Sequence, residues 1–190
     1  MSEEEIIGLS HVSFVVLGLV AEHPCHGKDI NKRIEERGMR SWTAIGRSSI
    51  YGVLKNLKKK GLVESWIEEE DNRAVKIYQI TIEGKEVLKT QIYNVLSNFV
   101  GRNDHNFYTA FAMLPVLSQE EQIEVFTKSL NKIKIHKKEL EKMLKHNAHN
   151  KLNVRGLFEH PIRILGADIK FLEWVLEEIK KGSGKIGSEA

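Results

Sequence analysis

Two groups of residues in this sequence have side chains that could bind a metal. His146 and His149 stand three residues apart, a spacing that can chelate a metal on one face of a helix. His23, Cys25 and His26 form a second group around a proline. Zinc sites use three or four protein ligands, and no further ligand at a suitable spacing accompanies either group. We therefore predict no metal site.

Other patterns typical of catalysis are missing or out of context. Residues 182–187 read Gly-Ser-Gly-Lys-Ile-Gly and match the G-x-G-x-x-G pattern of phosphate-binding loops. Such a loop binds phosphate between a strand and a helix, whereas this segment follows a helical pattern and precedes none. The sequence contains no nucleophile elbow, metal-hydrolase motif or triad-like placement of residues. We expect a protein that is not an enzyme and needs no cofactor.

The strongest chemical signal is a concentration of positive charge. The 190-residue chain has a formal net charge of only +3 at pH 7. Between His26 and Leu62, ten Lys and Arg residues stand against three Asp and Glu residues, a net charge of +7. Such a cluster attracts nucleic acid, because Lys and Arg displace the counterions bound to phosphates. The three lysines at 58–60 have an alternative explanation that needs no nucleic acid: they are solvated at the end of a helix, where the helix dipole favours cations.

A helix that begins near Ser48, a suitable N-cap, and ends at Gly61 presents much of this charge on one side. Its apolar residues share the other side: Ile50, Val53, Leu54 and Leu57. Lys and Arg reach phosphates, whereas Asn can pair with adenine and hydroxyl groups can reach base edges. We predict that Ser49, Tyr51 and Asn56 contact base edges. The whole set of residues predicted to contact DNA is Arg47, Ser48, Ser49, Tyr51, Lys55, Asn56, Lys59, Arg73 and Lys76.

The segments around this helix predict a winged helix-turn-helix domain. Apolar spacing indicates helices over residues 10–22 and 27–37, and strand-like stretches at 62–67 and 75–81 flank a turn at 69–73. That domain consists of short helices followed by a hairpin, and the helix just before the hairpin is basic. The acidic residues 68–71 would repel phosphate, so we place the hairpin tip away from the duplex and assign its DNA contacts to Arg73 and Lys76.

The second half of the sequence is helical. Ser118 and Glu121 form a capping box at the start of a long helix that runs to about His146. The fold class is therefore mainly α: an α+β winged helix-turn-helix domain at 1–88, an all-α dimerisation and effector domain at 89–181, and a flexible tail at 182–190. The apolar residues of a last helix either pack within the chain or form a homodimer interface. They are Ile162, Leu165, Ile169, Leu172, Leu176 and Ile179.

Three segments, in order, resemble the PadR family of bacterial transcriptional regulators: 26–30 (HGKDI), 49–63 (SIYGVLKNLKKKGLV) and 75–84 (VKIYQITIEG). The sequence differs from the family in having Lys28 in place of an aromatic residue and Gly52 in place of a proline. The resemblance covers residues 12–88. It implies that the helix bearing Tyr51 enters the major groove and that C-terminal helices form a dimer. It also implies repression and a small aromatic or amphipathic effector, for which Trp174 is the candidate contact.

The sequence thus predicts a homodimeric, sequence-specific repressor that binds double-stranded DNA and is released by a small-molecule effector. The alternative is a winged-helix protein-interaction scaffold without DNA binding; Lys55, Asn56 and Lys59 on the outer helix face favour DNA. The single cysteine, Cys25, suits a reducing compartment. The longest apolar run, 12–21, is too short for a membrane span of about 20 residues. We expect a cytoplasmic, nucleoid-associated protein without membrane partners.

Overall fold

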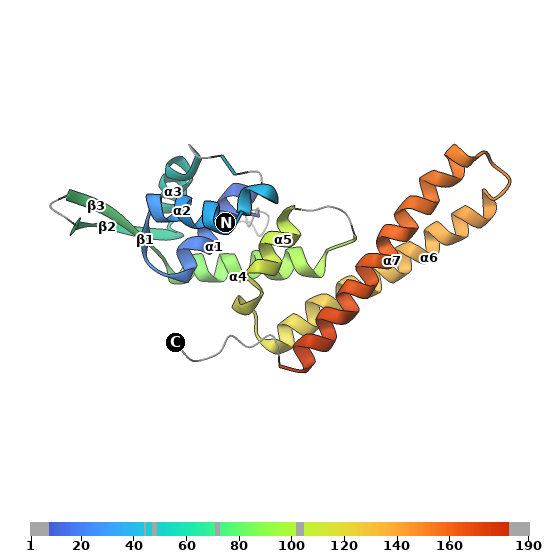
Figure 1. Cartoon of the computed structure of the whole chain (residues 1–190). Coiled ribbons are helices and arrows are strands. Elements are labelled where there is room, and N and C mark those ends of the chain that lie inside the picture. Colours follow the sequence, from blue (N-terminus) through green and yellow to red (C-terminus); the bar gives the residue numbers. More distant parts are fainter. Residues whose placement is uncertain (1–7, 44, 47–48, 71–72, 102–104, 183–190) are drawn as a thin grey trace. The chain divides into compact units, whose positions relative to one another are not determined.

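The computed structural model describes residues 8–43, 45–46, 49–70, 73–101 and 105–182. Contacts divide the chain into two compact units, one of residues 1–92 and 105–113, the other of residues 93–104 and 114–190. The elements, shown in Figure 1, are α1 (His11–Glu22), β1 (Cys25–His26), α2 (Gly27–Glu36), the 3-10 helix η2 (Met39–Ser41), α3 (Ser49–Lys59), β2 (Val63–Glu70), β3 (Arg73–Ile80), α4 (Ile82–Ser97), α5 (His105–Ala112), the 3-10 helix η3 (Leu114–Val116), α6 (Gln119–His146) and α7 (Leu152–Lys180).

Helix α1 forms the centre of the first unit. The hydroxyl of Ser10 accepts a hydrogen bond from the backbone N–H of Ser13 at 3.3 Å, which caps the helix. Residues 13–20 are all buried, so the helix is apolar on every side rather than amphipathic. It contacts α2, α3, α5 and β3. This explains why the longest apolar run of the sequence lies here.

A charged cluster ties the end of α1 to α2. The buried Arg33 donates through Nη1 to the backbone oxygen of Leu19 at 2.9 Å and to Glu22 Oε2 at 3.0 Å. Arg37 donates to both carboxylate oxygens of Glu22, at 2.5 and 2.8 Å. Burial disfavours the charge on Glu22, but the hydrogen bonds from Arg37 and Arg33 lower the pKa of its carboxyl below the ordinary value.

Helix α3 is amphipathic, as its spacing predicts. Ile50, Leu54 and Leu57 are buried against the domain core, where α3 contacts α1 and α2. Gly61 follows the helix with a φ of +74°, a conformation that glycine adopts without a Cβ penalty. The N–H of Leu62 donates to Leu57 O and that of Gly61 donates to Lys58 O, both at 3.0 Å. This Schellman motif ends the helix and starts β2.

The predicted hairpin is present, and a third strand joins it. The sheet order is β1-β3-β2, with all pairs antiparallel. Strand β1 was not predicted, because two residues are too few to show an alternating pattern. The predicted turn at 69–73 is wrong at its ends, since the ladder extends to the pair Glu70 and Arg73. Cross-strand hydrogen bonding outweighs the turn preference of those residues.

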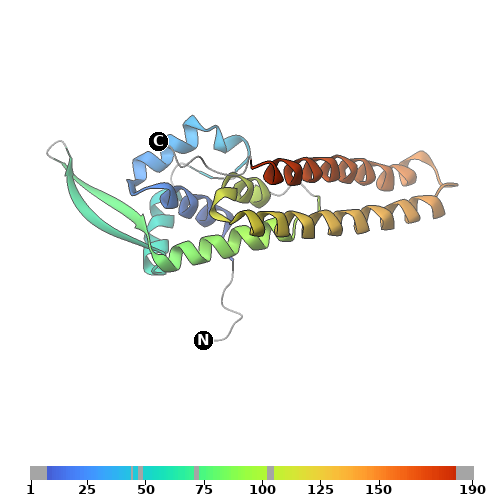
Figure 2. The same ribbon diagram turned by 90° about the horizontal axis from the view of Figure 1, so that it is seen from below.

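The second unit is built on the antiparallel pair α6 and α7, which run side by side in Figures 1 and 2. The capping box at Ser118 and Glu121 is confirmed. Helix α7 begins at Leu152, ten residues before the apolar series that predicted it, and continues through Pro161. A proline removes one helical hydrogen bond, so the sequence favours a start after it. Lys134 and Glu173 link the two helices with an ion pair of 2.7 Å.

The fold confirms the predicted class, a mainly α chain with a winged helix-turn-helix domain and long helices after it. Of the helices in the described ranges, none has both the length and the apolar character that crossing a bilayer requires.

Candidate nucleic-acid interface

The outer face of α3 carries the predicted DNA-contacting side chains. Tyr51 is 54% exposed, and Lys55, Asn56 and Lys59 are exposed as well. Arg47 and Ser48 lie outside the described residues. Ser49 is the first residue of α3, and its side chain is likewise outside what the structure describes.

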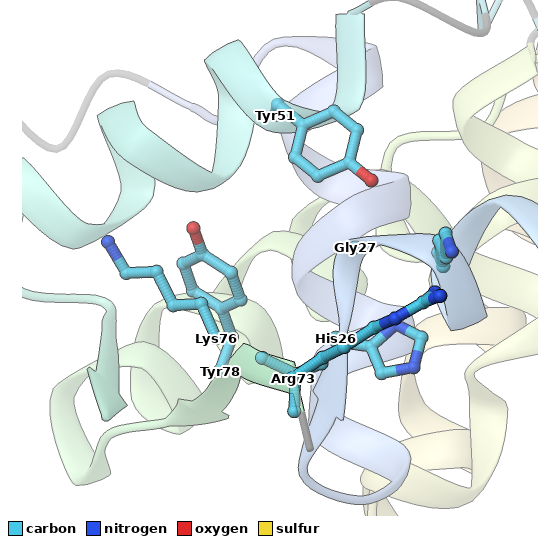
Figure 3. A pocket seen from close by; sticks show the side chains of 8 residues that line it. His26, Gly27, Tyr51, Arg73, Lys76 and Tyr78 are labelled. Atoms are coloured by element: carbon cyan, nitrogen blue, oxygen red, sulfur yellow. The ribbon is translucent and has the colours of Figure 1, made fainter. Parts of the chain in front are cut away.

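An open groove of about 650 Å³ lies beside α3 in the first unit. Figure 3 shows its labelled side chains arranged around the opening, with Tyr51 coming from α3 and Arg73, Lys76 and Tyr78 from β3. The groove brings together three of the predicted residues, Tyr51, Arg73 and Lys76. Lys55, Asn56 and Lys59 do not line it. The full lining is His26, Gly27, Lys28, Tyr51, Arg73, Val75, Lys76 and Tyr78.

Gly27 allows the Tyr51 ring to approach the first turn of α2. A Cβ at position 27 would lie 2.6 Å from Cε1 of Tyr51, closer than such atoms can pack. The absence of a side chain at Gly27 therefore leaves the space that the Tyr51 ring occupies. By contrast, a Cβ added at Gly52 on α3 would meet no atom within 4 Å.

Five groove residues were not in the predicted set, and three of them have side chains that can contact an anion: His26, Lys28 and Tyr78. Strand β1 brings His26 and Lys28 to the hairpin, because it pairs Cys25 with Tyr78 and His26 with Ile77. The N–H of His26 donates to Asp29 Oδ2 at 3.3 Å, which starts α2 beside the sheet. The run His26-Gly27-Lys28 stands out in the sequence as part of the resemblance, but its proximity to β3 depends on a pairing of only two residues.

The groove is electropositive. Lys28, Arg73 and Lys76 supply three cations, and none of the eight lining residues is acidic. Lys76 Nζ lies 5.6 Å from the centroid of the Tyr78 ring. Burial, with a smaller contribution from Tyr51, raises the pKa of Tyr78 above its ordinary value. Its hydroxyl therefore remains protonated at neutral pH and can act as a hydrogen-bond donor.

Strand β2 has the opposite charge. Glu64, Glu68 and Glu69 are exposed along it. In the strand order β1-β3-β2, β2 lies on the far side of β3 from β1. The acidic strand is thus the outer edge of the sheet, and the cations of β3 stand beside α2 and α3. Lys58 Nζ donates to Ser65 Oγ at 2.8 Å, which links α3 to the base of this strand.

The predicted dimer residues of α7 divide into two groups. Leu165, Leu172 and Ile179 are buried within this chain, whereas Ile162, Ile169 and Leu176 are half-buried. Other apolar side chains of α7 are more exposed, among them Ile164 at 42% and Trp174 at 54%. The Trp174 ring lies 5.9 Å from that of Phe171, centroid to centroid.

In the described ranges, no three His, Cys, Asp or Glu side chains gather as metal ligands would. His146 ends α6, and its Nδ1 donates to the backbone oxygen of Lys142 at 3.1 Å; His149 is exposed in the turn that follows. Cys25 is buried.

Comparison with known proteins gives a family match over part of the chain. The model of the "Transcriptional regulator PadR-like family" matches residues 16–90. None of the curated proteins compared matches the chain.

Several solved structures are similar. Bacillus subtilis PadR in complex with operator DNA is 22% identical, with 88% of this chain and 98% of that chain covered and a TM-score of 0.42. The same protein in complex with p-coumaric acid is 22% identical, with coverages of 90% and 99% and a TM-score of 0.37. A PadR family transcription regulator from Clostridium difficile is 21% identical, with coverages of 45% and 88% and a TM-score of 0.39.

The family match runs from residue 16, within α1, to residue 90, within α4. That match contains α3, the hairpin and every residue that lines the groove. The family is one of transcriptional regulators rather than of enzymes. Residues 16–90 of this chain match the model of the transcriptional regulator PadR-like family.

Proposed function

We propose that this protein is a sequence-specific transcriptional regulator that binds double-stranded DNA with the outer face of α3 and the adjoining groove. One observation carries the proposal: three cations, Lys28, Arg73 and Lys76, converge on a groove without an acidic lining residue, next to the exposed polar face of α3. Phosphates release counterions when they meet such cations, and this release supplies most of the nonspecific affinity for DNA.

The residues divide into two roles. Lys28, Lys55, Lys59, Arg73 and Lys76 contact phosphates, together with Arg47, which comes two residues before α3 in the sequence. Base edges are contacted by Tyr51, Asn56 and Ser49, together with Ser48, which precedes α3 in the sequence. The major groove of B-DNA, about 12 Å wide, admits one helix, and an Asn can pair there with both N6 and N7 of adenine.

We further propose that the protein acts as a homodimer and as a repressor that a small aromatic or amphipathic molecule releases from DNA at the nucleoid. A single α3 reads few base pairs, whereas a two-fold dimer reads two half-sites about 34 Å apart. The apolar side chains of α7 support this assembly, because Ile164 and Trp174 remain exposed in the single chain. Trp174 is also the proposed contact for the effector.

The alternative, a protein-interaction scaffold, receives less support from the same surface. Tyr51 is the one large apolar side chain exposed on the described part of α3. Protein-binding faces concentrate apolar and aromatic residues and lack lysine, which is the reverse of what α3 presents.

Fluorescence anisotropy tests the proposal with a duplex from the region upstream of the protein's own gene and a random duplex of equal length. We expect the protein to bind both duplexes, with an affinity that falls as the salt concentration rises from about 50 to 200 mM. We expect it to bind the upstream duplex more tightly than the random one. Lys28→Ala and Arg73→Ala should each reduce the slope of log K against log salt by about 0.9 on either duplex. The matched control is Lys85→Ala, which removes an exposed lysine of α4 outside the groove.

A second variant separates base reading from phosphate contacts. Asn56→Ala should reduce the preference between the two duplexes by about 1–3 kcal/mol and leave the salt slope unchanged. If the wild-type protein binds neither duplex in dilute buffer, the proposal is wrong.

A further inference from the structure

A second open hollow, of about 480 Å³, lies where α6 turns into α7 in the second unit. Its walls come from the last turn of α6, from the connecting turn and from the first two turns of α7. The lining is Leu144, Lys145, Ala148, Leu152, Arg155, Gly156 and Glu159. None of these residues belongs to the groove beside α3.

The floor of the hollow is apolar and unfilled. Leu152 is 76% exposed, although burial of a leucine side chain is worth about 1.5–3 kcal/mol. A Cβ added at Gly156 would meet no atom within 4 Å, so open space lies directly above the helix backbone. Leu144 and Ala148 complete the apolar surface. The volume is within the usual range of small-molecule pockets, about 300–1,000 Å³.

The rim has two cations and one anion. Among the described residues, Arg155 forms no salt bridge or side-chain hydrogen bond, and Lys145 interacts with Glu141 only through charge, without an ion pair. Glu159 is already engaged, because Arg163 donates to its Oε1 at 3.0 and 2.8 Å. The nearby Glu141 is held by Lys137 at 2.7 Å. The rim therefore has a net charge of +1 and an unpaired guanidinium available for an anionic group.

We propose that this hollow binds a small amphipathic monoanion, with its carboxylate or sulfonate on Arg155 and Lys145 and its apolar body over Leu152 and Gly156. The lining residues carry a net charge of +1, which a single negative charge on the ligand balances. A liquid water takes about 30 Å³, so the hollow has room for an apolar body of roughly fifteen non-hydrogen atoms. The site is separate from the DNA-contacting surface, and its test does not require DNA binding.

Calorimetric titration of the full-length protein tests this inference with octanoate and with octanamide, which has the same chain without the charge. We expect octanoate to bind with a stoichiometry of one per chain and octanamide to bind at least tenfold more weakly, since charge-assisted hydrogen bonds are about twice as strong as neutral ones. Equal binding of acid and amide, or no binding of octanoate, overturns the proposal.

Two variants locate the site. Arg155→Ala should weaken octanoate binding about tenfold, whereas Lys142→Ala, one turn away on α6 and outside the hollow, should leave it unchanged. Gly156→Leu fills the open space without a clash and should abolish binding while thermal unfolding shows a folded chain. If Gly156→Leu binds octanoate normally, the ligand lies elsewhere and the proposal fails. If Gly156→Leu instead changes the oligomeric state, a second copy occupies the hollow, which also overturns it.

Discussion

The groove beside α3 and the hollow at the α6–α7 turn are both open and both cationic, but their walls differ. The groove has three cations, two tyrosines and no acid, whereas the hollow has two cations, two leucines and one carboxylate. An extended polyanion such as a DNA backbone favours the first arrangement, because every phosphate adds attraction. A compact amphipathic anion favours the second, because its apolar body needs a surface that water wets poorly. Positive charge alone therefore does not identify a ligand; the groups between the charges do.

The two faces of α3 provide the largest test of the first region, since one face holds the fold and the other contacts the ligand. Leu54→Ala removes a fully buried side chain and should lower the free energy of unfolding by about 2–5 kcal/mol. Lys55→Ala, one residue along on the outer face, should change it by less than about 0.5 kcal/mol. Urea denaturation followed by circular dichroism measures both. A similar loss in the two variants would mean that the outer face also holds the fold.

The apolar surface of α7 gives the next largest effect. Trp174 is half exposed in the single chain, so a dimer that uses this face would bury it. Trp174→Ala should then weaken dimerisation about thirtyfold, or about 2 kcal/mol, as hot-spot aromatics do. Sedimentation equilibrium measures the change, with Lys170→Ala on the same helix as the control. A dimer of unchanged affinity would place the interface on another face.

Glycine substitutions compare the crowded groove with the open hollow. Gly27→Ala forces the Tyr51 ring away from α2, because the new Cβ would lie 2.6 Å from it. We expect specific DNA affinity to fall about tenfold, or about 1.4 kcal/mol, which is the scale of one lost base contact. Gly156→Ala meets no atom within 4 Å and should leave DNA affinity intact. Equal affinities for both variants in anisotropy titrations would remove Tyr51 from the interface.

The smallest effect concerns acid stability of the first unit. The pKa of Glu22 is lowered in the folded chain, so its contribution is present at neutral pH and is lost as the pH falls through that lowered pKa, below about 4.5. Glu22→Gln should therefore lower the free energy of unfolding at pH 7 by about 1 kcal/mol or less and have no effect near pH 2. Urea titrations at the two pH values measure the difference. A loss that persists in acid would mean that the ion pairs with Arg33 and Arg37 are not its cause.

Much of the fold could be predicted because its signals are local. Ser10 and the Ser118–Glu121 pair cap helices by side chains within three residues, and both caps are present. The inward face of α3 follows directly from its apolar spacing. The start of α7 could not be predicted, because a proline within a helix resembles a helix boundary and the packing against α6 outweighs it.

The sequence by itself determined the helix faces, the hairpin and the residues exposed on α3, because each depends on the periodicity and caps of one segment. Only the tertiary structure decided which cations share a groove: two residues of β1 pair with β3 and bring Lys28 to Arg73 and Lys76. It also decided that half of the apolar series on α7 is buried in this chain and that Leu152 is left uncovered. Such proximities arise from contacts between distant segments, which no local pattern records.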